Sequence, residues 1–138
     1  MTLPVSDIEH LIPQRQPFVM VDALLEYSES ALQAAYTVPP SNLLVADGYF
    51  QASGVLEHQA QSVALHTGYQ FFLAGKAAPL GYIGAVKSFK INRLPKINEK
   101  LLTKIEIMAE MDGVTLVKTE TKIGEETIAA SEMKTVIA

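Results

Sequence analysis

The chain has 138 residues, of which 49% are hydrophobic and 19% are charged, and it contains no cysteine. This length suits one domain with a substantial core, and a net charge of −4 at pH 7 excludes the large basic field of a nucleic-acid-binding protein. The lack of cysteine excludes disulfides, thiolate metal sites and a cysteine nucleophile. With no signal-peptide pattern and no apolar run of about 20 residues, we expect a soluble cytoplasmic protein without membrane contact.

The first third of the chain predicts a short helical turn followed by a β-hairpin. Residues 6–12 suit the turn, and an apolar strand follows over residues 18–27. Residues 31–38 form its hairpin partner, and the three residues between the two strands form the turn. Residues 41–53 then form a loop with turn signals.

The stretch GVLEHQAQSVALHTG, residues 54–68, predicts the single long helix of the chain. Ser53 is a suitable N-cap and Gly68 a suitable stop, although the helix can extend to about Leu73. At about 100° per residue, five residues fall on one narrow arc, which we expect to face the core: Leu56, Ala60, Val63, Ala64 and Thr67.

The other faces of this helix carry its polar residues. Glu57 and Gln61 lie one turn apart on one flank of the apolar arc, and His58 points roughly backwards. Leu65 and Tyr69 also lie behind the arc, so we expect a second subunit to cover that side.

The last third predicts four strands, over residues 80–92, 101–111, 114–123 and 126–138. The second strand alternates, with an apolar face of Leu101, Ile105, Ile107, Ala109 and Met111. One long helix wrapped by an antiparallel sheet of about six strands is an α+β hotdog domain, and a single such layer leaves sheet edges exposed. We therefore expect a single hotdog domain over residues 1–138 that forms a dimer.

Three blocks of the sequence resemble one known family. They are IPQRQPFVMVDALLEY at 12–27, LEHQAQ at 56–61 and GYIGAVKSFKINRLPKINEKL at 81–101. Their order and spacing resemble the bacterial 3-hydroxyacyl-[acyl-carrier-protein] dehydratases. The nearest resemblance is to the small dehydratase-like proteins of aryl-polyene and flexirubin-type pigment synthesis.

The resemblance implies dehydration of 3-hydroxyacyl thioesters to trans-2-enoyl thioesters, in fatty-acid or polyene-type synthesis. The substrate would be carried on the phosphopantetheine arm of acyl carrier protein, without a cofactor or metal of the enzyme itself. The family's helix glutamate matches Glu57 and its glutamine matches Gln61, while Gly54 loosely matches the residue whose backbone amide polarises the thioester carbonyl. The family's loop histidine is absent, because Tyr49 stands in its place and the loop is shortened; Gln14 also replaces a histidine of the opening block.

Further site residues follow from position and from the resemblance. His58 is the best-placed substitute proton carrier, and Tyr49 is a candidate hydrogen-bond donor. The residues expected to bind the acyl chain are Phe50, Val55, Tyr82, Ile83 and Gly84. A basic run is expected to dock the acidic carrier protein: Lys87, Lys90, Arg93 and Lys96.

Two other functions stay open from the sequence. A hotdog thioesterase needs only a helix carboxylate to activate water, and Glu57 with Gln61 suits that chemistry. Alternatively, the chain is a half-site subunit that pairs with a histidine-bearing hotdog paralogue. The dimer is accordingly expected to be either a homodimer or a heterodimer.

Overall fold

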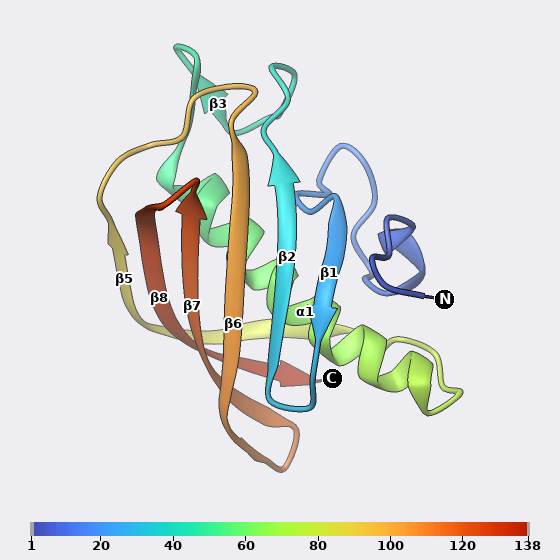
Figure 1. Ribbon diagram of the computed structural model, residues 1–138. Coiled ribbons are helices and arrows are strands. Elements are labelled where there is room, and N and C mark those ends of the chain that lie inside the picture. The colour runs from blue at the N-terminus through green and yellow to red at the C-terminus, as the bar shows by residue number, and fades with distance from the viewer. Residues whose placement is uncertain (1, 138) are drawn as a thin grey trace.

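The computed structural model describes residues 2–137, in which one long helix packs against one face of a curved six-stranded sheet (Figure 1). The elements in chain order are a 3₁₀ turn η1 (Ile8–His10), β1 (Ala23–Tyr27), β2 (Ala31–Thr37), β3 (Val45–Ala46), β4 (Tyr49–Phe50), α1 (Ala52–Leu73), β5 (Gly81–Ile91), β6 (Lys100–Met111), β7 (Val114–Ile123) and β8 (Glu126–Ile137). The large sheet is antiparallel, with the order β1-β2-β6-β7-β8-β5, and β3 pairs with β4 in a small separate hairpin. The predicted two-layer α+β fold is confirmed.

The prediction for the strand over residues 101–111 is wrong beyond Ile107. Ile107 pairs with Val117, but Ala109 pairs with Leu116, so the intervening residue forms a bulge in β6. One extra residue reverses the alternation of side chains, because successive residues of a strand point to opposite faces. Met111 consequently leaves the core face and is 75% exposed.

The start of α1 and the predicted stop at Gly68 differ from the structure, while the extension to Leu73 is confirmed. The N-cap is Gln51 rather than Ser53, and the helix continues through Gly68 to Leu73. Gly68 is needed for another reason: a Cβ on this residue would overlap the carbonyl oxygen of Leu11. The glycine therefore allows the N-terminal segment to lie directly against the helix.

The face of α1 that packs on the sheet is opposite to the one predicted. The predicted stripe is wrong for four of its five members, because Leu56, Ala60, Ala64 and Thr67 are only partly buried, while Val63 is buried in the core as predicted. The face toward the sheet is buried and includes Val55, His58, Ser62, Leu65, His66 and Tyr69. Three of these six residues are polar, so hydrophobic periodicity alone selected the wrong side.

The N-terminal segment, and not a second subunit, covers Leu65 and Tyr69. Both residues are buried within the subunit, in one cluster with apolar residues of the segment before β1 and of the sheet. The segment supplies Val5, Ile8, Leu11, Ile12, Val19 and Val21 to this cluster. Figure 1 shows the segment beside β1, at the edge of the sheet farthest from β5.

Candidate active site

A groove of about 340 Å³ lies between α1, the β8–β5 edge of the sheet and the loop before β1. The helix contributes four of the five residues that the sequence placed in the core, all but Leu56, together with Glu57. The lining residues are Pro13, Gln14, Glu57, Ala60, Val63, Ala64, Thr67, Pro79, Gly81, Ile83, Thr135, Val136 and Ile137. A largely apolar groove with one carboxylate on its wall suits an acyl chain whose reacting end carries a polar group.

Glu57 is held in place by Gln61, as their one-turn spacing predicts. The Gln61 Nε2 amide donates hydrogen bonds to Glu57 Oε2 at 2.6 Å and to the Phe18 carbonyl at 2.8 Å. Its Oε1 accepts a hydrogen bond from the Met20 N–H at 2.7 Å. The amide of Gln61 thus has only one satisfactory orientation, and this orientation directs a donor at Glu57.

His58 points away from the predicted arc, as expected, but that side of α1 faces the interior of the subunit. Its side chain is 0% exposed, with Nδ1 2.7 Å from the Met20 carbonyl and Nε2 2.7 Å from Thr103 Oγ1. Burial lowers the pKa of His58 to about 4, against a smaller opposite effect of the Met20 carbonyl. Both ring nitrogens are engaged inside the subunit, so the ring has no free nitrogen for a substrate in the groove.

The lowered pKa of His58 makes the stability of the fold dependent on pH. Between pH 6.5 and about 4 the unfolded chain binds a proton at this residue and the folded chain does not. The stabilising contribution is therefore complete above pH 6.5 and is lost as the pH falls to about 4, by about 3 kcal/mol in all. Urea unfolding of wild type and His58→Gln at pH 7.5 and 4.5 measures this difference. Equal pH dependence of the two proteins would contradict the assignment.

The residues expected to bind the acyl chain divide into two groups. Phe50 and Val55 are fully buried in a core cluster with Tyr36 and Leu101, away from the groove lining, so their predicted position is wrong. Ile83 lines the groove as expected. Gly84 lies on β5 against Val136, and the side chain of Tyr82 falls outside the described part of the structure.

Neither Gly54 nor Tyr49 presents a hydrogen-bond donor to the groove. The Gly54 N–H donates to the Gln51 carbonyl at 2.9 Å, so this amide is not free to bind a thioester oxygen. A Cβ on Gly54 would overlap the ring of Phe50, so the glycine is required for packing. Tyr49 is 41% exposed, and its backbone pairs with Lys96 rather than approaching the groove.

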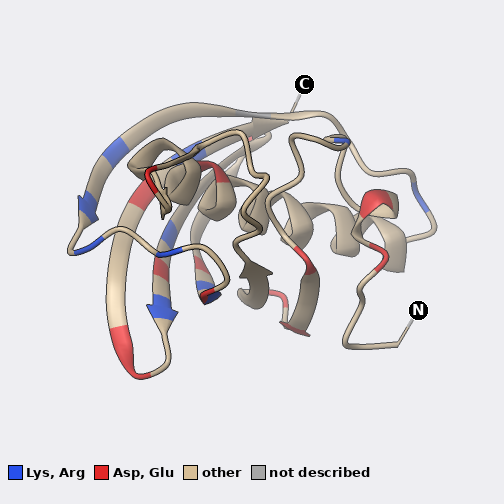
Figure 2. Cartoon of the chain, turned by 90° about the horizontal axis from the view of Figure 1, so that it is seen from above, with Lys and Arg blue, Asp and Glu red and all other residues tan. Residues whose placement is uncertain are grey.

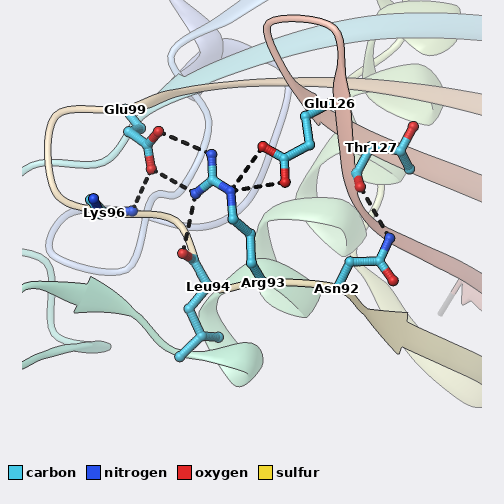
Figure 3. Close-up of polar contacts among 7 residues, drawn as sticks. All are labelled: Asn92, Arg93, Leu94, Lys96, Glu99, Glu126 and Thr127. Atoms are coloured by element: carbon cyan, nitrogen blue, oxygen red, sulfur yellow. Dashed lines mark hydrogen bonds and ion pairs between the residues drawn. The ribbon is translucent and has the colours of Figure 1, made fainter.

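Arg93 connects three parts of the chain instead of presenting a free positive charge (Figure 3). Its Nη1 and Nη2 atoms donate to Glu99 at 3.0 and 3.1 Å, and its Nε donates to both oxygens of Glu126 at 3.0 and 3.1 Å. These bonds raise the pKa of Arg93 and lower the pKa of Glu99. Arg93 ties the end of β5 to the β7–β8 turn and shares its charge with two carboxylates, and its role in carrier docking stays a prediction.

The remaining three basic residues of the predicted docking run are exposed, and two of them lie on β5 (Figure 2). Lys87 lies 3.8 Å from Glu132, which is a weak surface pair. The side chains of Lys90 and Lys96 are exposed to solvent. Carrier docking by these three lysines stays a prediction.

The sequence did not predict the residues that hydrogen-bond to His58 and Gln61. Met20 contributes only backbone groups, which no residue pattern reveals. Thr103 had a usable signal, because it lies midway between the inward-facing Leu101 and Ile105 on an alternating strand. Thr103 therefore points a hydroxyl, rather than an apolar side chain, at α1.

The model of the ApeP-like dehydratases matches residues 6–137 of the chain. The chain belongs to the ApeP-like dehydratase family. This confirms the resemblance drawn from the sequence and, with it, the assignment as a dehydratase of the hotdog fold.

Curated relatives agree with this family, and solved structures agree with the fold. The 3-hydroxyacyl-[acyl-carrier-protein] dehydratase FabZ of Vibrio campbellii is 24% identical over 139 residues, covering 96% of this chain and 92% of the relative. FabZ of Proteus mirabilis is 29% identical over 140 residues, covering 96% and 91%. The dehydratase heterocomplex ApeI:P from Xenorhabdus doucetiae superposes with a TM-score of 0.90 at 14% identity, covering 100% of this chain and 93% of the other. The PaaI protein of Escherichia coli superposes with a TM-score of 0.65 at 13% identity, covering 82% and 80%.

Within residues 2–137, no helix has the length and hydrophobicity that a membrane-spanning segment requires.

Proposed function

We propose that this chain supplies Glu57 to the dehydration of 3-hydroxyacyl thioesters carried by acyl carrier protein, and that a related hotdog subunit supplies the histidine. One observation carries the proposal: Glu57 lies on the wall of the groove, and none of the three histidines of the chain does. His10 is exposed and lies 3.0 Å from Asp7, while His58 and His66 are buried inside the subunit. The groove therefore has an acid without a base.

The chemistry needs both groups. A base removes the proton from Cα, the Cα–Cβ double bond forms, and the β-hydroxyl leaves as water after it accepts a proton. Glu57 delivers that proton, and Gln61 keeps its carboxyl group directed into the groove. Residues of low polarity along the helix, such as Ala60 and Ala64, contact the acyl chain.

The exposed edge of β5 is where we place the second subunit. β5 is the last strand of the sheet, and the unpaired backbone of an edge strand is available to pair with another chain. Ile83 and Val86 on this strand are 39% and 40% exposed, which leaves apolar surface beside the groove. The description of the ApeI:P neighbour as a heterocomplex supports a pair of unlike subunits.

Val86→Glu is expected to weaken this pairing at least about tenfold, because a charge would be placed at the centre of an apolar contact. Sedimentation or light scattering across a concentration series measures the change. Met111→Glu is the matched control, since Met111 is an exposed apolar residue on β6, three strands away from β5 in the sheet and beside the β6–β7 turn. Equal effects of the two variants would contradict an interface on β5.

The proposed function is tested by assaying the purified chain alone and together with a histidine-bearing hotdog subunit from the same source. The substrate is a 3-hydroxyacyl thioester of acyl carrier protein, and the readouts are enoyl absorbance and free thiol. We expect enoyl product only from the mixed pair. Full dehydration by the chain alone would overturn the half-site proposal, and release of free thiol without enoyl product would indicate a thioesterase.

A further inference from the structure

The backbone of Met20 is held on both sides by side chains of α1. Its carbonyl oxygen lies 2.7 Å from His58 Nδ1, and its N–H donates to Gln61 Oε1 at 2.7 Å. Residues 18–20 precede β1, whose pairing with β2 starts at Ala23. Hydrogen bonds from the helix, together with the burial of Val19 and Met20, therefore fix this segment, rather than the strand pairing of the sheet.

The direction of each hydrogen bond around His58 follows from the groups involved. A carbonyl oxygen only accepts, so Nδ1 carries the hydrogen that points to Met20. Nε2 of the neutral ring is then an acceptor, and it receives the hydroxyl hydrogen of Thr103. Thr103 Oγ1 lies 2.6 Å from Thr121 Oγ1, which accepts in turn from Gln59 Nε2 at 3.0 Å.

The result is a single directed chain of hydrogen bonds that starts at Gln59 and ends at the Met20 carbonyl. These hydrogen bonds cross the interior from Gln59 on α1 to Thr121 on β7, then to Thr103 on β6, and return to α1 at His58. Reversing the histidine tautomer would leave two acceptors facing each other at Met20. Since an unmatched buried polar group is costly, the ring is locked in one tautomer and one orientation.

We propose that His58 is a positioning residue that orients Glu57 through Met20 and Gln61. His58 fixes the Met20 carbonyl, and with it the direction of the adjoining Met20 N–H. That N–H determines which way the Gln61 amide faces, and the amide determines where Glu57 Oε2 lies. This inference rests on the proposed function, because it assigns His58 a role only if Glu57 acts on the substrate.

Two substitutions of His58 test the hydrogen bonds of its two ring nitrogens separately. In His58→Asn the side-chain amide occupies the place of Cγ and Nδ1, so it keeps a donor for Met20 and loses the partner of Thr103. In His58→Gln the amide reaches the place of Nε2, so it keeps an acceptor for Thr103 and loses the donor for Met20. Thr103→Val is the matched control, because it removes the other hydrogen bond of the ring and leaves Met20 held.

The assay uses the mixed pair of subunits and separates kcat from KM. We expect His58→Gln to lower kcat about 10- to 100-fold, with KM changed less than about threefold, because a carboxyl group misplaced by a fraction of an ångström loses its geometry for proton transfer. His58→Asn and Thr103→Val are expected to keep kcat within about threefold of wild type, although both lose a buried hydrogen bond. Equal kcat losses in His58→Asn and His58→Gln, or an equal loss in Thr103→Val, would overturn the proposal.

A second readout does not depend on activity. In nitrogen-15 NMR spectra, His58→Gln is expected to shift the Met20 amide and the Gln61 side-chain amide, whereas His58→Asn leaves both near their wild-type positions. Unchanged resonances in His58→Gln would overturn the coupling even if Glu57 proves essential. If Glu57→Gln instead keeps full activity, the proposed function fails, and the NMR comparison still decides whether His58 controls Gln61.

Discussion

Glu57→Gln is expected to lower dehydration by the assembled enzyme about 100- to 10,000-fold, the usual contribution of a general acid or base. Glutamine has the same shape as glutamate and can still accept the hydrogen bond from Gln61 Nε2. It cannot supply the proton that the departing β-hydroxyl needs. The variant should therefore fold and pair normally while its kcat falls, which initial rates of enoyl formation by the mixed pair will measure.

The control for this experiment is Glu106→Gln. Glu106 is exposed on β6, and its side chain is directed away from the inward-facing Ile105 and from the groove. This substitution removes the same charge from the protein without touching the site, so the rate should stay within about twofold. A Glu57→Gln enzyme that matched the control would show that Glu57 takes no part in the reaction.

Gly68→Ala is expected to destabilise the fold by about 3 kcal/mol or more, or to prevent folding. Helix propensity predicts the opposite sign, because alanine in a helix is favoured over glycine by about 1 kcal/mol. The steric effect decides, since the added methyl group would overlap the Leu11 carbonyl oxygen, a backbone atom that cannot rotate away. To remove this overlap, the segment that carries Ile8 and Ile12 would have to move out of the core.

Denaturant unfolding monitored by circular dichroism measures this loss, and Gly81→Ala is the matched control. A Cβ on Gly81 would lie 3.6 Å from the Val136 carbonyl oxygen, which is ordinary contact. The control should change the free energy of unfolding by less than about 0.5 kcal/mol. A Gly68→Ala protein as stable as wild type would mean that the N-terminal segment is not packed against α1 as described.

Most of the fold was predictable from the sequence because its signals are local. The β7 prediction over residues 114–123 agrees with Val114–Ile123, and the hairpin of β1 and β2 turns where the three intervening residues predict. Alternation and turn residues act over a few positions, so they do not depend on the rest of the chain. The β6 prediction was wrong after Ile107 because a bulge depends on the partner strand.

The orientation of α1 was not predictable in the same way. A search for apolar spacing selects Ala60, Ala64 and Thr67, yet these residues line a groove. The buried face instead carries His58, whose two ring nitrogens have a backbone and a hydroxyl partner, and His66, whose Nε2 lies 2.9 Å from the Ser28 carbonyl. Whether a polar residue can be buried depends on partners that are distant in sequence, so no local pattern reveals it.

The sequence by itself determined the hotdog fold and the dehydratase family. It also determined the pairing of Glu57 with Gln61, because helix geometry places residues four apart on one side. Only the tertiary structure decided which side of the helix forms the groove, that Arg93 is held by two carboxylates, and that His58 points into the core. The physical reason is common to all three. Each depends on which groups meet a side chain after folding, and for His58 these include the Met20 backbone, whose hydrogen bonds no residue type encodes.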